Sequence, residues 1–127
     1  MLTHIILTVG NIERSLAFYE TALKPLNIRF FLPFNGEDDH PDLWGLGDGK
    51  RAFFWLKQGK HDPNSIHWGF DAESKLIVDD FYRAALSAGA RDTISPRIRS
   101  EYTSDYYAAD VFDPDGYSFE VVHRSLG

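Results

Sequence analysis

The sequence predicts an α+β fold built from two tandem βαβββ modules within one domain. Two stretches carry the same residue pattern at a constant offset of 63 residues, which indicates an internal duplication. A chain of 127 residues has the length of one domain, and half of it would be marginal alone, so we expect the halves to share one sheet system. The matching pairs are His4 and His67, Asn11 and Ser74, Phe18 and Phe81, Tyr19 and Tyr82, and Leu23 and Leu86.

Each half opens with a predicted strand. Bulky apolar residues occupy alternate positions along residues 4–9 and again along residues 66–71, which is the period of a half-buried strand. Successive side chains of a strand point to opposite faces, so His4 and His67 lie on the face opposite the large apolar residues. The duplication therefore gives each module one histidine at an equivalent position.

A helix follows each of these strands. Asn11 and Ser74 are good N-cap residues, because a side-chain oxygen can accept from the free amide groups of the first turn. Apolar residues at helical spacing follow both caps. Pro25 ends the first helix and Gly89 suits the end of the second.

Three further strands are predicted after each helix. They cover roughly residues 28–32, 43–46 and 52–56 in the first half, and 93–97, 106–112 and 117–123 in the second. The last two strands are joined by Asp113-Pro114-Asp115-Gly116, which is a strong turn signal. Residues 59–64 form a linker, so the single domain 1–127 divides into module 1, about 1–58, and module 2, about 65–127.

Composition excludes several classes of protein. The absence of cysteine rules out disulfides, thiolate metal sites and a cysteine nucleophile. The net charge of -6 argues against a nucleic-acid partner, because binding to phosphates relies on clustered lysine and arginine. The N-terminus has neither a basic region nor a long apolar run, so we expect no signal peptide, no membrane span and a cytoplasmic protein.

Two histidines and one glutamate are candidate metal ligands. Glu120 lies between apolar neighbours on the predicted last strand, where an unpaired charge is costly. If the opening and closing strands line one concave surface, His4, His67 and Glu120 converge as two imidazoles and one carboxylate, a set that leaves coordination positions open. The structural alternative is that neither histidine binds a metal and that Glu120 pairs with an arginine, for which the candidates are Arg51, Arg97 and Arg99.

These features together resemble the vicinal oxygen chelate superfamily, which includes glyoxalases, extradiol dioxygenases, fosfomycin-resistance enzymes and bleomycin-binding proteins. The resemblance rests on the module order, the histidine opening each half and the run DPDGYSFE at residues 113–120, and it covers almost the whole chain. It implies a cup-shaped mixed sheet with the helices outside. It also places His4, His67 and Glu120 where the superfamily has its metal ligands.

One position departs from the glyoxalase I pattern. Glyoxalase I has a fourth protein ligand on the last strand of the first module. Aligning Asp48-Gly49 with Asp115-Gly116 puts Phe53 opposite Glu120, and neither neighbour of Phe53 can bind a metal. The remaining set of three resembles the dioxygenases and the fosfomycin enzymes more closely.

The segment before the last two strands supplies candidate substrate-binding residues. Arg97 and Arg99 suit a carboxylate or phosphate, which guanidinium groups bind in bidentate fashion. Tyr106 or Tyr107 can donate a hydrogen bond or act as general acid, and we assign catalysis to Tyr106 with Glu120. The structural alternative is an exposed hairpin arm with core tyrosines.

Three other histidines receive no role. His40 and His61 lie in polar, turn-rich loops and are expected to face solvent. His123 is three residues beyond Glu120, and on a strand this spacing points it to the opposite face.

The leading hypothesis is a metal-dependent lyase, isomerase or dioxygenase. A divalent ion (iron, manganese, nickel, cobalt or zinc) would chelate a small substrate through two neighbouring oxygens. The alternative from another class is a metal-free protein that sequesters a small molecule, as bleomycin-resistance proteins do. The resemblance also implies a homodimer, in which the three ligands come from one chain or from two.

Overall fold

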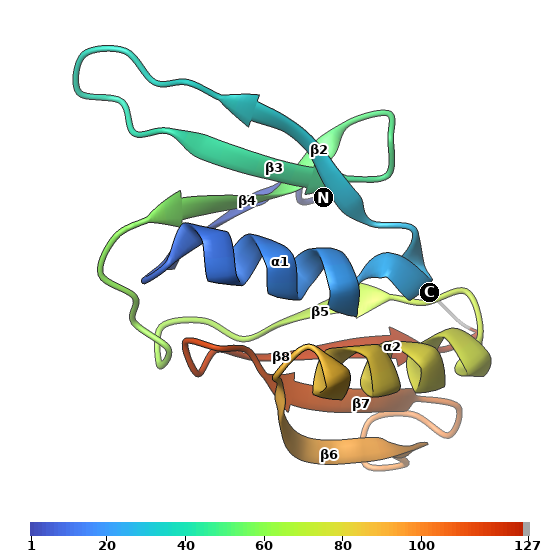
Figure 1. Ribbon diagram of the computed structural model, residues 1–127. Coiled ribbons are helices and arrows are strands. Elements are labelled where there is room, and N and C mark those ends of the chain that lie inside the picture. The colour runs from blue at the N-terminus through green and yellow to red at the C-terminus, as the bar shows by residue number, and fades with distance from the viewer. Residues whose placement is uncertain (126–127) are drawn as a thin grey trace.

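The chain forms two βαβββ modules in sequence, as the computed structural model shows for residues 1–125 (Figure 1). Module 1 contains β1 (Ile5–Val9), α1 (Ile12–Ala22), the short 3-10 helix η1 (Lys24–Leu26), β2 (Arg29–Phe34), β3 (Leu43–Gly47) and β4 (Ala52–Gln58). Module 2 contains β5 (Trp68–Asp71), α2 (Lys75–Ser87), β6 (Arg91–Ile98), β7 (Tyr107–Phe112) and β8 (Ser118–His123). The predicted α+β class and the duplicated module are confirmed.

Each module has its own four-stranded mixed sheet. The strand orders are β1-β4-β3-β2 (sheet 1) and β5-β8-β7-β6 (sheet 2). In both sheets the opening strand pairs in parallel with the closing strand of its own module, and the other pairs are antiparallel. Across the described residues no ladder joins sheet 1 to sheet 2, so the modules do not share one hydrogen-bonded sheet.

Both helices begin at the predicted caps. The Asn11 side chain accepts a hydrogen bond from the Arg14 amide at 3.0 Å, and the Ser74 hydroxyl accepts one from the Ile77 amide at 3.2 Å. These bonds satisfy amide groups that have no partner inside the first turn.

A shared aromatic core holds the modules together. Each helix covers one face of its own sheet (Figure 1), and the two helices also contact each other. Phe119 of β8 packs against Phe18 and Tyr19 of α1, with ring centroids 6.3 Å and 5.5 Å away, and against Phe81 of α2 at 5.6 Å. The core therefore replaces the expected shared sheet, and one face of each sheet carries no helix of the described chain.

The turn at residues 113–116 adds a polar junction between the modules. The Asp115 carboxylate accepts a hydrogen bond from Arg14 at 2.7 Å, and the Tyr19 hydroxyl donates to Asp113 at 2.5 Å. Arg14 and Tyr19 both belong to α1, so the turn of module 2 is bound to the helix of module 1. None of the helices in residues 1–125 has both the length and the apolar character needed to cross a membrane.

Candidate metal centre

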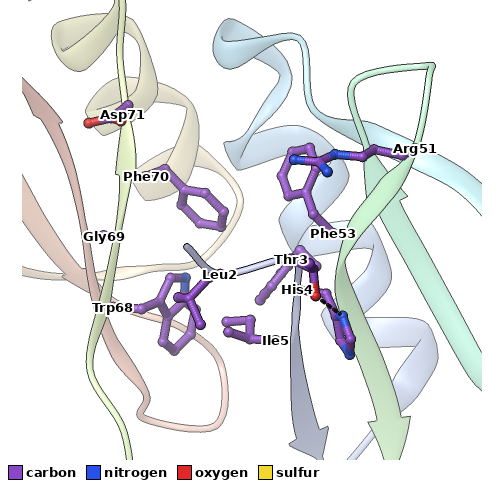
Figure 2. Close-up of a pocket in the computed structure, with 11 residues that line it drawn as sticks. Leu2, Thr3, His4, Ile5, Arg51, Phe53, Trp68, Gly69, Phe70 and Asp71 are labelled. Atoms are coloured by element: carbon purple, nitrogen blue, oxygen red, sulfur yellow. Dashed lines mark hydrogen bonds between the residues drawn. The ribbon is translucent and has the colours of Figure 1, made fainter. Parts of the chain in front are cut away.

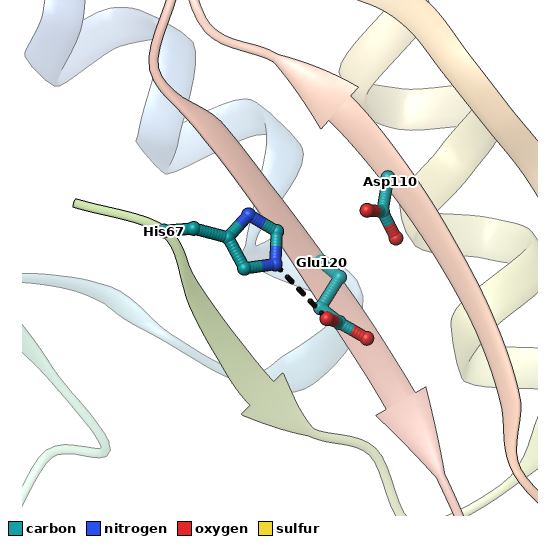
Figure 3. Close-up of side chains that lie close together, drawn as sticks. All are labelled: His67, Asp110 and Glu120. Atoms are coloured by element: carbon teal, nitrogen blue, oxygen red, sulfur yellow. Dashed lines mark hydrogen bonds and ion pairs between the residues drawn. The ribbon is translucent and has the colours of Figure 1, made fainter. Parts of the chain in front are cut away.

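A cluster of three metal-binding side chains lies on the face of sheet 2 that has no helix (Figure 3). His67 precedes β5, Asp110 lies on β7 and Glu120 on β8, and one ligand atom from each lies within 4.8 Å of the others. The ladders explain the convergence. Asp110 and Gly69 are the direct cross-strand neighbours of Glu120, and His67 lies two residues before Gly69, on the same face.

Hydrogen bonds hold Glu120 in place. Its Oε1 lies 3.0 Å from His67 Nε2, and its Oε2 accepts from the Tyr106 hydroxyl at 2.7 Å. The other ring nitrogen of His67 lies 3.1 Å from the Ser118 hydroxyl. Both carboxylate oxygens and both imidazole nitrogens are thus oriented by the surrounding strands.

A buried arginine lies behind the cluster. Arg99 is 2% exposed, and its Nη2 donates to Asp110 Oδ1 at 2.5 Å. Its Nη1 lies 3.8 Å from Glu120 Oε2, so the arginine partner considered for Glu120 is present. The Nε of Arg99 is buried without a hydrogen-bond partner in the described part of the chain. One guanidinium faces two carboxylates here, so the group of three side chains carries a net negative charge that favours binding of a cation.

Burial changes the titration of Asp110 in the cluster and of Tyr106 beside it. It raises the pKa of Asp110, while the ion pair with Arg99 acts in the opposite direction. Burial, together with the hydrogen bond to Glu120, also raises the pKa of Tyr106 above its usual value of 10.0. Tyr106 therefore keeps its proton at neutral pH and remains a hydrogen-bond donor.

The cluster fits a divalent metal by the chemistry of its donors. One imidazole and two carboxylates form a nitrogen and oxygen set, which suits the first-row metals that do not need thiolate. Metal bonds to such donors are about 2.0–2.2 Å long, so atoms within 4.8 Å of one another can share one ion after small rotations. To bind the metal, Asp110 would have to weaken its hydrogen bond with Arg99. His67 and Glu120 would only have to replace their hydrogen bond with each other by bonds to the metal.

The structure brings together two of the three predicted ligands and adds a third that was not predicted. Within the described chain His4 is not part of the cluster, since it is exposed and its Nδ1 bonds to the Thr3 hydroxyl at 2.8 Å. Asp110 was missed although its sequence context marks it. It is the only charged residue of an otherwise apolar strand, and the tight turn at 113–116 pairs it with Glu120.

The candidate substrate residues divide into two groups. Tyr106 and Arg99 contact the cluster, as described above. The Tyr107 hydroxyl instead donates to Asp79 of α2 at 2.7 Å, on the helix-covered face, and the exposed Arg97 lies 3.5 Å from Glu101. Tyr107 and Arg97 therefore make no contact with the metal-binding side chains within the chain.

The residue of module 1 that corresponds to Glu120 is Trp55. The alignment predicted from the sequence, which placed Phe53 there, is wrong by two residues. Ile5 pairs with Phe54 as its repeat-related residue Trp68 pairs with Phe119, so the next position of each closing strand corresponds. The turn before β4 contains two residues, Lys50 and Arg51, that the turn before β8 lacks. Aligning the two turns therefore shifted the strand by two positions. Tryptophan does not bind metals either, so the departure from glyoxalase I remains.

The unassigned histidines lie away from the cluster. His123 Nδ1 is 2.9 Å from the Ala72 carbonyl oxygen, on the face opposite Glu120 as predicted. His40 is exposed, and the exposed His61 lies 3.7 Å from Asp115.

Comparison with known proteins places the chain in a family. Residues 1–121 match the Glyoxalase/Bleomycin resistance protein/Dioxygenase superfamily. The chain belongs to this superfamily. A glyoxalase/bleomycin resistance protein from Albidiferax ferrireducens T118 has a similar structure, with 25% identity, a TM-score of 0.75 and 98% of each chain covered. No curated protein sequence matches the chain significantly.

Two further proteins share the fold at lower identity. Glyoxalase I from Leishmania major is 21% identical, with a TM-score of 0.66 over 97% of this chain and 86% of its own. The fosfomycin resistance protein FosX from Listeria monocytogenes is 17% identical, with a TM-score of 0.69 over 99% of this chain and 94% of its own. These two likenesses establish the fold alone.

Proposed function

We propose that this protein is a divalent-metal-dependent enzyme of the glyoxalase/dioxygenase type, acting on a small substrate through two neighbouring oxygens. The reaction classes compatible with this design are those of a lyase, an isomerase or a dioxygenase. The observation that carries the proposal is the pairing of His67 with Glu120 beside Asp110, on a sheet face that no helix covers. Membership of a superfamily with metal-dependent enzymes supports it.

His67 and Glu120 are the proposed ligands, and two residues compete for the third position. Asp110 is close enough, but its carboxylate accepts a hydrogen bond from the buried Arg99. His4 was predicted from the repeat, and it would have to come from a second copy of the chain. A bound divalent metal would act as a Lewis acid that polarises a substrate oxygen.

The surrounding residues have their own parts in the proposed chemistry. Tyr106 holds a proton next to Glu120 and can donate a hydrogen bond to a substrate oxygen. Arg99 places a fixed positive charge behind the carboxylates, where it limits their mutual repulsion. Since Arg99 is buried, it acts on Glu120 and Asp110 rather than as the exposed substrate clamp expected from the sequence.

The test is metal content by mass spectrometry on protein purified without a metal-affinity tag. After incubation with iron, manganese, nickel, cobalt or zinc, we expect near-stoichiometric metal in the native protein and in His40→Ala, which removes an exposed loop histidine. His67→Ala and Glu120→Gln should lose it. Little metal in the native protein under all five conditions would refute the proposal and favour a metal-free binding protein.

Two more variants identify the third ligand. His4→Ala abolishes binding if His4 is the ligand, whereas Asp110→Asn then weakens it by about 10–100-fold, as for a residue that supports a ligand. The reverse pattern assigns Asp110. Metal-loaded protein would then be assayed with diols, catechols and hemithioacetals of α-keto aldehydes, with His67→Ala as the inactive control.

A further inference from the structure

A pocket lies at the seam between the modules, and none of the three side chains of the metal-binding cluster lines it (Figure 2). It measures about 380 Å³ and lies between β1 and β4 on one side and β5 on the other. This volume falls within the range of about 300–1,000 Å³ that is typical of small-molecule sites. His67, Asp110 and Glu120 do not line it.

Aromatic side chains line both sides of the pocket. Phe53 and Phe54 come from β4, and Trp68 and Phe70 come from β5. In Figure 2, Phe53 and Phe70 face each other across the opening. Rings on opposite walls provide the flat apolar surfaces between which another aromatic ring packs well.

One wall carries a polar group with no partner. Trp68 Nε1 is buried and donates to no acceptor among the residues that the structure describes. The indole cannot easily turn to find one, because it stacks on Phe119 with centroids 5.3 Å apart and planes inclined by 9°. An unsatisfied buried donor costs about 1–3 kcal/mol, and a ligand oxygen that displaces the atoms covering this nitrogen would remove that cost.

The opposite wall carries an unpaired positive charge. Arg51 has no carboxylate within ion-pair distance in residues 1–125. Arg51 and Phe53 both line the pocket, and Figure 2 shows the Asp71 carboxylate pointing away from it. The Asp48 carboxylate interacts with the Arg51 charge but forms no ion pair with it, so the guanidinium remains available to an anion. Guanidinium binds carboxylates through two parallel hydrogen bonds.

We propose that the seam pocket binds a small aromatic carboxylate with a second oxygen acceptor at the far end of the ring. The ring lies between Phe53 and Phe70, the carboxylate binds Arg51, and the second oxygen accepts from Trp68 Nε1–H. The pocket shares no side chain with the cluster of His67, Asp110 and Glu120. His4 lines its rim, so the site stays separate from a metal centre that uses Asp110 and adjoins one that uses His4.

The test is a titration with 4-hydroxybenzoate, followed by nitrogen–proton NMR of the tryptophan indole groups. The Trp68 signal is identified by its absence in Trp68→Phe. We expect 4-hydroxybenzoate to shift this signal, and 4-hydroxybenzamide, which lacks the charge, to bind about tenfold more weakly, a difference of about 1.4 kcal/mol. Arg51→Gln should reduce the affinity for the acid to that for the amide, and the exposed Arg97→Gln should leave it unchanged.

Two further comparisons make the result decisive. Native protein should prefer 4-hydroxybenzoate to benzoate, and Trp68→Phe should lose that preference. Binding must persist in His67→Ala, which separates this site from the metal centre. An unshifted Trp68 signal at millimolar ligand, equal affinity for acid and amide, unchanged affinity in Arg51→Gln, or loss of binding in His67→Ala would each overturn the proposal.

Discussion

The position of the Glu120 carboxylate depends on the absence of a side chain opposite it. Gly69 is the direct cross-strand neighbour of Glu120. A Cβ atom at Gly69 would lie 3.1 Å from Glu120 Cγ, closer than ordinary van der Waals contact. Glycine therefore leaves the carboxylate free to turn toward His67 and Tyr106.

Gly69→Ala should weaken metal binding without unfolding the protein. The added methyl group displaces the flexible Glu120 side chain rather than the backbone, so we expect the metal affinity to fall at least several-fold and the stability to change by less than about 1 kcal/mol. Isothermal titration calorimetry with the metal that the native protein takes up measures the metal affinity, and urea denaturation measures the stability. Unaltered metal affinity in a folded variant would show that the Glu120 side chain accommodates the methyl group, and would contradict the prediction.

Asp105, which directly precedes Tyr106, makes the stability of the protein depend on pH in the acid range. Hydrogen bonds from Ser125 and then from Thr103 lower the pKa of Asp105 to about 2. Because an unfolded aspartate titrates near pH 3.9, this carboxylate contributes stability above about pH 4 and loses it as the pH falls through about 2. Carbon NMR of the carboxyl group should give a midpoint near 2, and the stability advantage over Asp105→Asn should vanish over the same range. A midpoint near 3.9 would contradict these contacts.

At the scale of elements, the turn between β7 and β8 has two functions. Gly116 takes a φ of 91°, a conformation that favours glycine, and this closes the hairpin that sets Asp110 opposite Glu120. The same turn buries Asp113, which binds the hydroxyl of the fully buried Tyr19 on α1. One short segment thus fixes both the register of the metal-binding strands and the junction between modules.

Tyr19→Phe should destabilise the protein by about 1–3 kcal/mol, because it removes a hydrogen bond from the buried Asp113 carboxylate. The matched control is Tyr82→Phe, since Tyr82 is the repeat-related tyrosine of α2 and is only half-buried. We expect that control to change stability by no more than about 0.5 kcal/mol. Chemical denaturation of both variants makes the comparison, and equal effects would show that the junction contributes nothing beyond the loss of a hydroxyl group.

At the scale of the whole molecule, the sequence predicted individual helices and strands better than it predicted which residues of different elements lie side by side. Apolar periodicity and caps gave both α-helices and the eight strands to within a few residues, because these signals lie within one element, whereas the short helix η1 was not predicted. Trp55 was missed because the turn before β4 is two residues longer than its counterpart, and Asp110 because its place beside Glu120 is set by the register of two strands rather than by a pattern within one strand. The separation of His4 from His67 follows from the packing of the modules, which no local pattern encodes.

The uncovered faces of the two sheets differ in character. On sheet 1, Ile6 is 48% exposed and Phe34 is 44% exposed, and both line a hollow of about 430 Å³ with Trp55 and His4. The uncovered face of sheet 2 carries the charged cluster instead. The predicted homodimer would cover the apolar residues if a second copy placed its sheet 1 opposite sheet 2, and shared metal sites require that this arrangement bring its His4 to His67.

Such a dimer makes a specific prediction about mixed variants. Sedimentation should give twice the mass of the chain, and replacing the exposed Ile6 and Phe34 by glutamate should give monomers. His4→Ala and His67→Ala should each bind no metal alone. When both are produced together, random pairing makes half of the dimers mixed, each with one intact site, so about a quarter of the native metal content should return. Metal retained by His4→Ala alone would assign the third position to Asp110, and no recovery in the mixture would refute sites shared between chains.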